Sequence, residues 1–129
     1  MAVVKYKYDD LMNPVIQALK QLGGSGTNEE INNKVTEIVG IPSDQLEVLH
    51  NPDKGGMTEI EYRLMWTRTH LKSYGILENS SRGVWALTPV GSKTDKVDEK
   101  QVVRFVREQL KKNKSEEETV EEKPDEQVK

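Results

Sequence analysis

The spacing of apolar residues changes from helical to β type in the middle of the chain. Apolar residues recur with a helical period from Ile60 to about Tyr74, and the pattern stops at Gly75. Two short β-type runs follow, at residues 76–78 and 84–88, and a small polar turn joins them. A helix that leads directly into such a hairpin is the layout of a winged helix. We therefore expect the rest of the chain to support this unit.

The predicted helix over residues 60–74 has two distinct faces. One stripe should face the core, and it consists of Ile60, Leu64, Thr67, Leu71 and Tyr74. The other side should meet solvent or a ligand, and it carries Met65, Arg68, Thr69 and Lys72. Trp66 lies on a flank with Arg63 and His70. We expect Trp66, like Trp85 in the hairpin, to fill a small core rather than to stack on a ligand.

A first helix is predicted near the N-terminus. Asn13 is its expected N-cap, with Pro14 at the first helical position, although the helix could begin a turn earlier at residues 9–10. The glycine-rich run 23–26 ends this helix and is interpreted as a linker.

A second helix opens with the capping-box pattern of residues 27–30 and closes at Gly40. Residues 41–56 then combine a short helical turn over Leu46 with turn residues. This insertion is longer than a tight helix-turn-helix connection. Both early helices are too small to fold alone, so they must pack on the helix at 60–74.

A further helical pattern opens at Asp98. Its apolar stripe is Val102, Val103, Val106 and Leu110. Basic residues sit around the opposite side, namely Lys100, Arg104, Arg107 and Lys111.

We divide the chain into three parts: a winged-helix domain at 1–93, an added helix for packing, dimerisation or linkage at 94–114, and a disordered acidic tail at 115–129. In the tail, apolar residues are too few to offset the entropy of ordering. The predicted class is therefore α+β, mostly helical: a winged helix-turn-helix with a C-terminal β-hairpin wing and an added C-terminal helix.

Composition limits the classes of protein that the chain can belong to. Hydrophobic residues make up 34% of it, and no apolar run approaches the length of a membrane span. The first ten residues contain charges and no apolar core, so we expect no signal peptide. Cysteine is absent, which excludes disulfides and zinc fingers and is compatible with the cytoplasmic location that we expect.

The formal net charge of −3 hides an uneven distribution. Residues 115–129 hold seven of the 22 acidic and two of the 19 basic residues, which leaves fifteen acidic and seventeen basic residues in the rest. A faintly basic body can bind nucleic acid through a local patch, but its total charge does not demand it.

Enzymatic and metal sites are poorly supported. His50 and His70 are the only histidines, and neither has carboxylate or histidine neighbours at metal-ligand spacing. Pro52-Asp53 and the later Asp98-Glu99-Lys100 formally spell the PD…(D/E)xK pattern of Mg²⁺-dependent nucleases. That chemistry needs adjoining strands, whereas these residues fall in a predicted turn and at a helix start. We expect no catalytic residue, no metal and no cofactor.

A nucleic-acid interface is better supported. Helix 60–74 and the hairpin turn carry side chains suited to bases and phosphates. The candidate DNA-binding residues are Arg63, Arg68, Thr69 and Lys72 on the helix, with Ser80, Ser81 and Arg82 in the turn. Arg68 and Lys72 could equally be an ordinary solvated pair, and Arg63 could be an anchor against the first helix.

The chain also resembles a known family. The runs YDDLMNPVIQALKQLGG and EYRLMWTRTHLKSYGILENSSRGVWALTPVG, with the segment between them, resemble the N-terminal domain of Mrr-type restriction endonucleases over residues 6 to about 93. The most specific parts are Arg63-x-x-Trp66, Leu71-Lys72-x-x-Gly75-Ile76-Leu77 and the run from Arg82 to Gly91.

This resemblance implies a winged helix that binds double-stranded DNA. In the family, the domain precedes a separate PD…(D/E)xK nuclease domain that cuts DNA, often in response to methylated bases. The chain departs from that pattern because it lacks the nuclease domain, so it is either a fragment of a longer nuclease or a solitary domain. The expected role is target recognition in an Mrr-like restriction system. The alternatives are a stand-alone regulator, forming a homodimer through residues 98–112, and a protein-interaction module.

Overall fold

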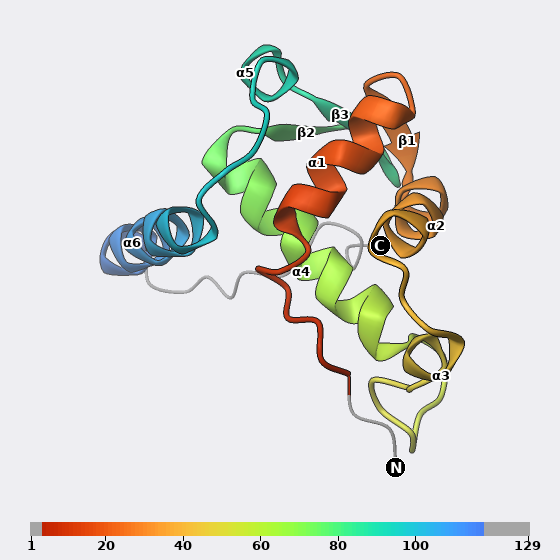
Figure 1. The fold of residues 1–129 in the computed structure, drawn as a ribbon. Coiled ribbons are helices and arrows are strands. Elements are labelled where there is room, and N and C mark those ends of the chain that lie inside the picture. The colour runs from red at the N-terminus through yellow and green to blue at the C-terminus, as the bar shows by residue number, and fades with distance from the viewer. Residues whose placement is uncertain (1–3, 118–129) are drawn as a thin grey trace.

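Helix α4 (Glu59–Tyr74) runs through the middle of the molecule and organises the other elements around it (Figure 1). The computed structural model describes residues 4–117. The remaining elements, in chain order, are α1 (Met12–Gln21), β1 (Ser25–Thr27), α2 (Asn28–Val39), α3 (Ser43–Leu46), β2 (Leu77–Ser81), β3 (Val84–Leu87), α5 (Pro89–Ser92) and α6 (Glu99–Glu117). This mostly helical α+β arrangement is consistent with a winged helix and confirms the predicted class.

The three strands form one antiparallel sheet in the order β1-β3-β2. The predicted hairpin is present, with β2 beginning at Leu77 and a register shift between Asn79 and Ser81 before the turn. Gly83 completes that turn with φ 70°. The interpretation of residues 23–26 as a plain linker was wrong, because β1 begins at Ser25 and pairs with β3. A three-residue strand is too short to show a period in the sequence.

Helix α1 begins earlier than its expected cap. It starts at Met12, after a turn in which the Asp10 amide donates to the Lys7 carbonyl at 3.0 Å. The prediction of Asn13 as N-cap was therefore wrong. Its side chain instead links α1 to the chain leading into α6, because it accepts from the Val97 amide at 2.8 Å and donates to the Val97 carbonyl and to Glu99, each at 3.1 Å.

Helices α2 and α4, which lie before and after the insertion at residues 41–56, both begin with a capping box. In α2 the Glu30 amide donates to Thr27 Oγ1 at 3.1 Å while the Thr27 amide donates to Glu30 Oε1 at 2.9 Å, which confirms the predicted capping box. Thr58 and Glu61 form a second box at the start of α4. Each box satisfies amides that the first helical turn leaves unpaired.

The core lies between α1, α2, α4, the sheet and the first half of α6. Its fully buried larger side chains include Leu11, Ile16, Leu19, Ile31, Leu64, Leu71, Leu77 and Trp85. The predicted core role is confirmed for Trp85. It was wrong for Trp66, which is only half-buried on the surface of α4.

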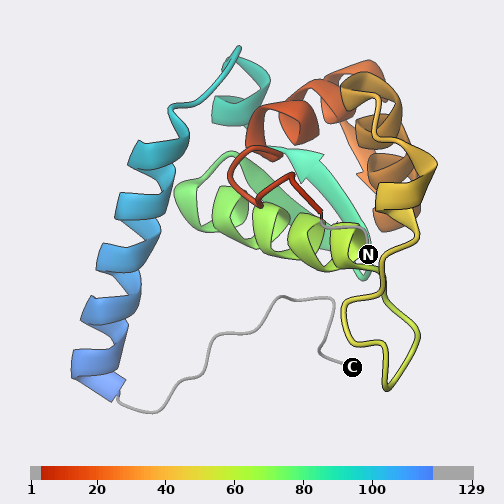
Figure 2. The same ribbon diagram turned by 60° about the horizontal axis from the view of Figure 1, so that its bottom comes forward.

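Helix α6 packs across the C-terminal part of α4 and then projects past it on the side away from the sheet (Figure 2). Val102 and Val106 are buried in this contact, and the Phe105 ring meets the Tyr74 ring edge-on at 5.3 Å. Leu110, the last residue of the predicted apolar stripe, is exposed. The helix reaches Glu117, three residues beyond the predicted end at 114, and the rest of the predicted acidic tail lies outside the described residues.

Candidate nucleic-acid interface

The N-terminal segment, residues 4–8, covers one flank of α4 and is held there by Arg63. The Arg63 Nη1 donates to the carbonyls of Val4 at 3.2 Å and Tyr6 at 2.9 Å, while its Nε donates to Glu59 at 2.6 Å. One step along the helix, the Thr67 hydroxyl lies 2.6 Å from the Tyr8 carbonyl. Arg63 thus anchors this segment, which supports the anchoring alternative, although the segment rather than the first helix is what it holds.

Helix α2 and strand β3 cover the opposite flank of α4, where Arg68 lies. The Arg68 side chain is buried, with 3% of the residue exposed. Its Nη1 donates to Asn32 Oδ1 at 2.9 Å, and its guanidinium carbon lies 5.8 Å from the centre of the Trp85 ring. Met65 beside it is also buried. The expectation that Met65 and Arg68 meet solvent or a ligand was wrong, because α2 closes over this flank.

Two asparagines one turn apart on α2 link this helix to α4 and to β3. Asn32 accepts from Arg68 of α4, and Asn28 Oδ1 accepts from the Trp85 indole nitrogen of β3 at 2.8 Å. The i, i+4 spacing of Asn28 and Asn32 places both amides on one helix face. That spacing was the signal in the sequence that could have revealed the contact.

The side of α4 that remains open carries the other two helix candidates. Lys72 is exposed, and Ser73 beside it is exposed as well. Thr69 is half-buried, and its Oγ1 is a buried atom that has no hydrogen-bond partner among the described residues. Of the four predicted helix residues, Arg63 and Arg68 therefore pack, Thr69 has a buried hydroxyl, and Lys72 is exposed.

The three candidates in the hairpin turn lie on the surface. Ser80, Ser81 and Arg82 are all exposed. The Asn79 side-chain amide braces the turn, because it donates to the carbonyls of Ser81 at 2.9 Å and Val84 at 2.8 Å.

The tip of this hairpin lies against the start of α2, since the Asn28 amide donates to the Gly83 carbonyl at 3.0 Å. The open side of α4 and the hairpin turn together form what we call the α4–wing face. It consists of Thr69, Lys72, Ser80, Ser81 and Arg82.

A shallow groove of about 380 Å³ runs between the start of α2 and α4, with Asn28, Asn32, Met57, Glu61, Met65 and Arg68 along it. Its acidic residue Glu61 is tied to the backbone of α4, because its Oε1 accepts from the Thr58 amide at 2.9 Å. The groove therefore offers mainly amide and thioether surface, with the Arg68 guanidinium beneath it.

Sequence reasoning missed a row of aromatic rings along α4. Tyr62, Trp66 and His70 follow at i, i+4 spacing, with edge-on ring contacts at 6.3 and 6.4 Å. His50 stacks on Tyr62 at 3.6 Å, and Tyr8 lies 4.7 Å from His70. Tyr8, Tyr62 and Trp66 also line a groove of about 310 Å³.

Two ionisable groups beside this row have shifted pKa values. Burial lowers the pKa of His70, whose Nδ1 lies 2.9 Å from the Trp66 carbonyl. Partial burial opposes ionisation of Glu59, but hydrogen bonds from His50 and Arg63 outweigh it and lower the pKa of that carboxyl. Glu59 is therefore a fixed anionic support for Arg63.

A comparison with known protein families shows which family the chain belongs to. The Mrr N-terminal domain family matches residues 8–97, which is well over half of the chain. The chain belongs to this family. No curated protein and no solved structure gives a match. The Mrr N-terminal domain is associated with restriction systems and is not itself a catalytic nuclease domain.

The structure gives physical reasons for the most specific residues of the Mrr N-terminal domain in this chain. Arg63 holds the N-terminal segment, and Trp85 fills the core. Thr88 caps α5 by accepting from the Gly91 amide at 3.0 Å, and its hydroxyl lies 2.7 Å from the Gly75 carbonyl. Gly91 itself lies so close to Ile76 that an added Cβ would meet the Ile76 carbonyl oxygen at 2.2 Å.

The nuclease-like pattern does not assemble in the Mrr N-terminal domain. Asp53 lies in the turn before α4, whereas Asp98 caps α6 by accepting from the Lys100 amide at 3.0 Å. Within residues 4–117 there is no cluster of three potential metal ligands. Among the helices of the same described region, none is long and apolar enough to cross a membrane.

Proposed function

We propose that the chain binds double-stranded DNA through the α4–wing face and serves as the target-recognition part of an Mrr-like restriction system. The observation that carries this proposal is the placement of α4. Its open side bears the exposed Lys72 with the half-buried Thr69 beside it, and the hairpin turn with Arg82 lies beside the start of α2. A B-DNA major groove admits one helix, and a neighbouring turn can then reach the backbone.

Each residue of this face has a role that suits its chemistry. Lys72 and Arg82 supply positive charge for phosphates, while Ser80 and Ser81 supply hydroxyl donors that fit the backbone or an adjacent minor groove. The Thr69 hydroxyl is buried, so in this proposal its side chain rotates to reach the bases. Arg63 and Arg68 hold α4 in place rather than touch DNA, because their guanidinium groups already bind Glu59, backbone carbonyls and Asn32.

Cleavage belongs to a separate nuclease domain in this proposal. The chain recognises the target, and a PD…(D/E)xK nuclease domain in a longer parent protein or in a partner cuts it. Methylated bases are the proposed trigger, as the family implies.

A fluorescence titration of the whole chain with a 30-base-pair duplex at low salt tests this function. Methylated and unmethylated duplexes of one sequence are compared, together with Lys72→Ala and Arg82→Ala variants. We expect wild-type binding, and each variant should lower the slope of log K against log salt by about one, since each removes roughly one phosphate contact. Slopes equal to wild type in both variants would contradict this placement.

Protein binding is the second candidate function. The half-exposed Trp66 and Tyr62 on the aromatic row favour it, since aromatic side chains are enriched at protein interfaces. It would be preferred if wild-type chain bound neither duplex at low salt. A regulator that dimerises through α6 has weaker support, because most of the apolar stripe of α6 is buried or half-buried, with Val102 and Val106 packed in the core.

A further inference from the structure

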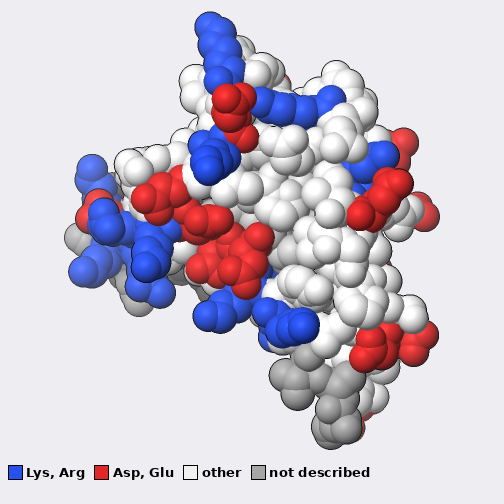
Figure 3. Space-filling view, in the orientation of Figure 1, with Lys and Arg blue, Asp and Glu red and all other residues white. Residues whose placement is uncertain are grey.

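Helix α6 carries a row of cations that the α4–wing face does not use. Lys100, Arg104, Arg107 and Lys111, which we call the α6 cation stripe, are all exposed and follow one another at helical spacing. Figure 3 shows the resulting concentration of basic side chains over α6, whereas the surface over α1 is mostly uncharged. With a rise of 1.5 Å per residue, the stripe is about 16 Å long.

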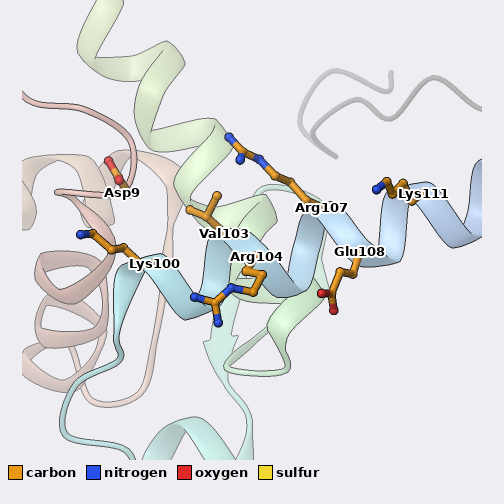
Figure 4. Close-up of a pocket in the computed structure, with 7 residues that line it drawn as sticks. All are labelled: Asp9, Lys100, Val103, Arg104, Arg107, Glu108 and Lys111. Atoms are coloured by element: carbon orange, nitrogen blue, oxygen red, sulfur yellow. The ribbon is translucent and has the colours of Figure 1, made fainter.

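These four cations have no acidic partner in the described part of the chain. The ion pairs found there involve Lys20, Lys34, His50 and Arg63 instead. The stripe lines a groove of about 430 Å³ together with Val103, Glu108 and Asp9 (Figure 4). Asp9 lies at the Lys100 end and Glu108 on the side of the stripe, so positive charge prevails along Arg104, Arg107 and Lys111.

The position of the stripe relates it to α4. In Figure 4 the Arg107 side chain points toward α4, and Lys111 projects from the same side of α6 one turn further on. This part of α6 extends beyond α4 on the side away from the sheet (Figure 2). Helix α6 is therefore a basic wall next to α4, on the flank opposite to α2 and Arg68.

The α4–wing face alone is weakly charged. It contributes Lys72 and Arg82, but α4 and the wing also expose Glu61 and Glu78. Phosphate contacts supply much of the affinity of proteins for duplex DNA. A face with two cations and two nearby carboxylates leaves most of that attraction to be supplied elsewhere on the chain.

We propose that the α6 cation stripe is a second DNA site, which binds backbone phosphates of the duplex held by the α4–wing face. The inference rests on the proposed function and assigns two parts of DNA binding to different elements. Helix α4 and the wing position the target, and α6 supplies most of the electrostatic affinity. Phosphates on one strand follow at about 3.4 Å along the duplex axis, so a stripe about 16 Å long spans roughly five of them. Four cations without acidic partners in the described chain match such a row of anions.

Charge-neutralising variants of the full chain test this division. One variant carries Lys100→Gln, Arg104→Gln, Arg107→Gln and Lys111→Gln. The matched control carries Lys5→Gln, Lys54→Gln, Lys93→Gln and Lys96→Gln, which removes the same charge from exposed positions elsewhere. Binding to a 30-base-pair duplex is measured from 50 to 300 mM salt, and circular dichroism checks the fold. A Glu108→Gln variant removes a negative charge from the same groove, so the net positive charge of the groove increases.

The stripe variant should lower the salt slope by about three to four, because each of the four phosphate contacts contributes about 0.9. The control should lower it by less than one, and Glu108→Gln should tighten binding about two- to fivefold. A stripe variant that matches its control in slope and affinity would overturn the α6 site while wild-type binding still upheld the proposed function. If the stripe variant fails to fold, unchanged binding by Glu108→Gln overturns the site. Absence of wild-type binding would overturn both proposals.

Discussion

The guanidinium carbon of Arg68 lies 5.8 Å from the centre of the Trp85 ring, which joins helix α4 to strand β3 through a buried cation–π contact. Asn32 completes the arrangement by accepting from Arg68 at 2.9 Å. A charge buried in this way is stabilised by its hydrogen bond and by the face of the indole. The contact fixes α4 relative to the wing, so its first consequence is for stability.

Replacing Arg68 should unfold the domain more readily rather than change how it meets DNA. Arg68→Ala removes the cation–π contact, leaves Asn32 Oδ1 without its donor and opens a cavity, which together should cost about 2–4 kcal/mol. Urea denaturation followed by circular dichroism measures the loss. Arg104→Ala, which changes an exposed arginine, is the control and should stay within about 0.5 kcal/mol of wild type. A similar small change for Arg68→Ala would show that its burial contributes little.

Asn13 should control the attachment of α6. Its side chain makes three hydrogen bonds to Val97 and Glu99, so Asn13→Ala leaves a half-buried amide and carbonyl of Val97 without partners. We expect a loss of about 1–3 kcal/mol and faster hydrogen exchange in residues 97–106. The exposed Asn33→Ala on α2 provides the comparison. Equal exchange in residues 97–106 for the two variants would count against this role.

Gly91 should tolerate no side chain. A Cβ there would meet the Ile76 backbone oxygen at 2.2 Å, so α5 would have to move away from the end of α4. Gly91→Ala should cost about 2–3 kcal/mol in thermal or urea unfolding. Gly26→Ala is a matched control, since the closest contact of its Cβ would be the flexible end of Leu22 at 2.9 Å, and Glu30 and Ile31 would lie at ordinary contact distances of 3.5 and 3.6 Å. A larger loss of stability for Gly26→Ala than for Gly91→Ala would contradict this role of Gly91.

His70 should make stability depend on pH. Burial, the largest cause, lowers its pKa in the folded state, and Arg107 lowers it further, while Asp9 and the Trp66 carbonyl oppose the shift. The unfolded side chain titrates near pH 6.5, so stability is fully present above that range and is lost as the pH falls through 6.5 toward the folded pKa. Unfolding free energies at pH 7.5 and 5.5 should differ less in His70→Gln than in wild type. An identical difference in both would refute the assignment.

The elements with a strong period or a clear punctuation signal could be predicted from the sequence. The helix at 60–74, the capping box at Thr27 and the hairpin after Gly75 depend on local patterns, and the structure has all three. Strand β1 could not be predicted, because three residues next to glycines carry no period. Its existence depends on pairing with β3, which is a tertiary contact.

The candidate DNA-binding residues could be predicted only in part, because their exposure also depends on tertiary contacts. A helical wheel places Arg68, Thr69 and Lys72 on one side of α4, but it cannot show which neighbouring helix covers that side. Asn32 of α2 reaches Arg68 and withdraws it from the surface, while Lys72 remains exposed. The aromatic row on α4 was hidden in the same way, since the expectation of a core role for Trp66 assumed that its flank was covered.

The most direct test of duplex binding by the α4–wing face is a two-dimensional nitrogen–proton NMR titration of the chain with a 16-base-pair duplex. The proposed binding mode predicts that amide signals shift in residues 69–73 of α4, in 79–83 of the wing and, where the α6 cation stripe contacts the duplex, in 100–111 of α6, while those of α1 and α5 stay in place. Shifts confined to α1 and α5, or none at low salt, would contradict it.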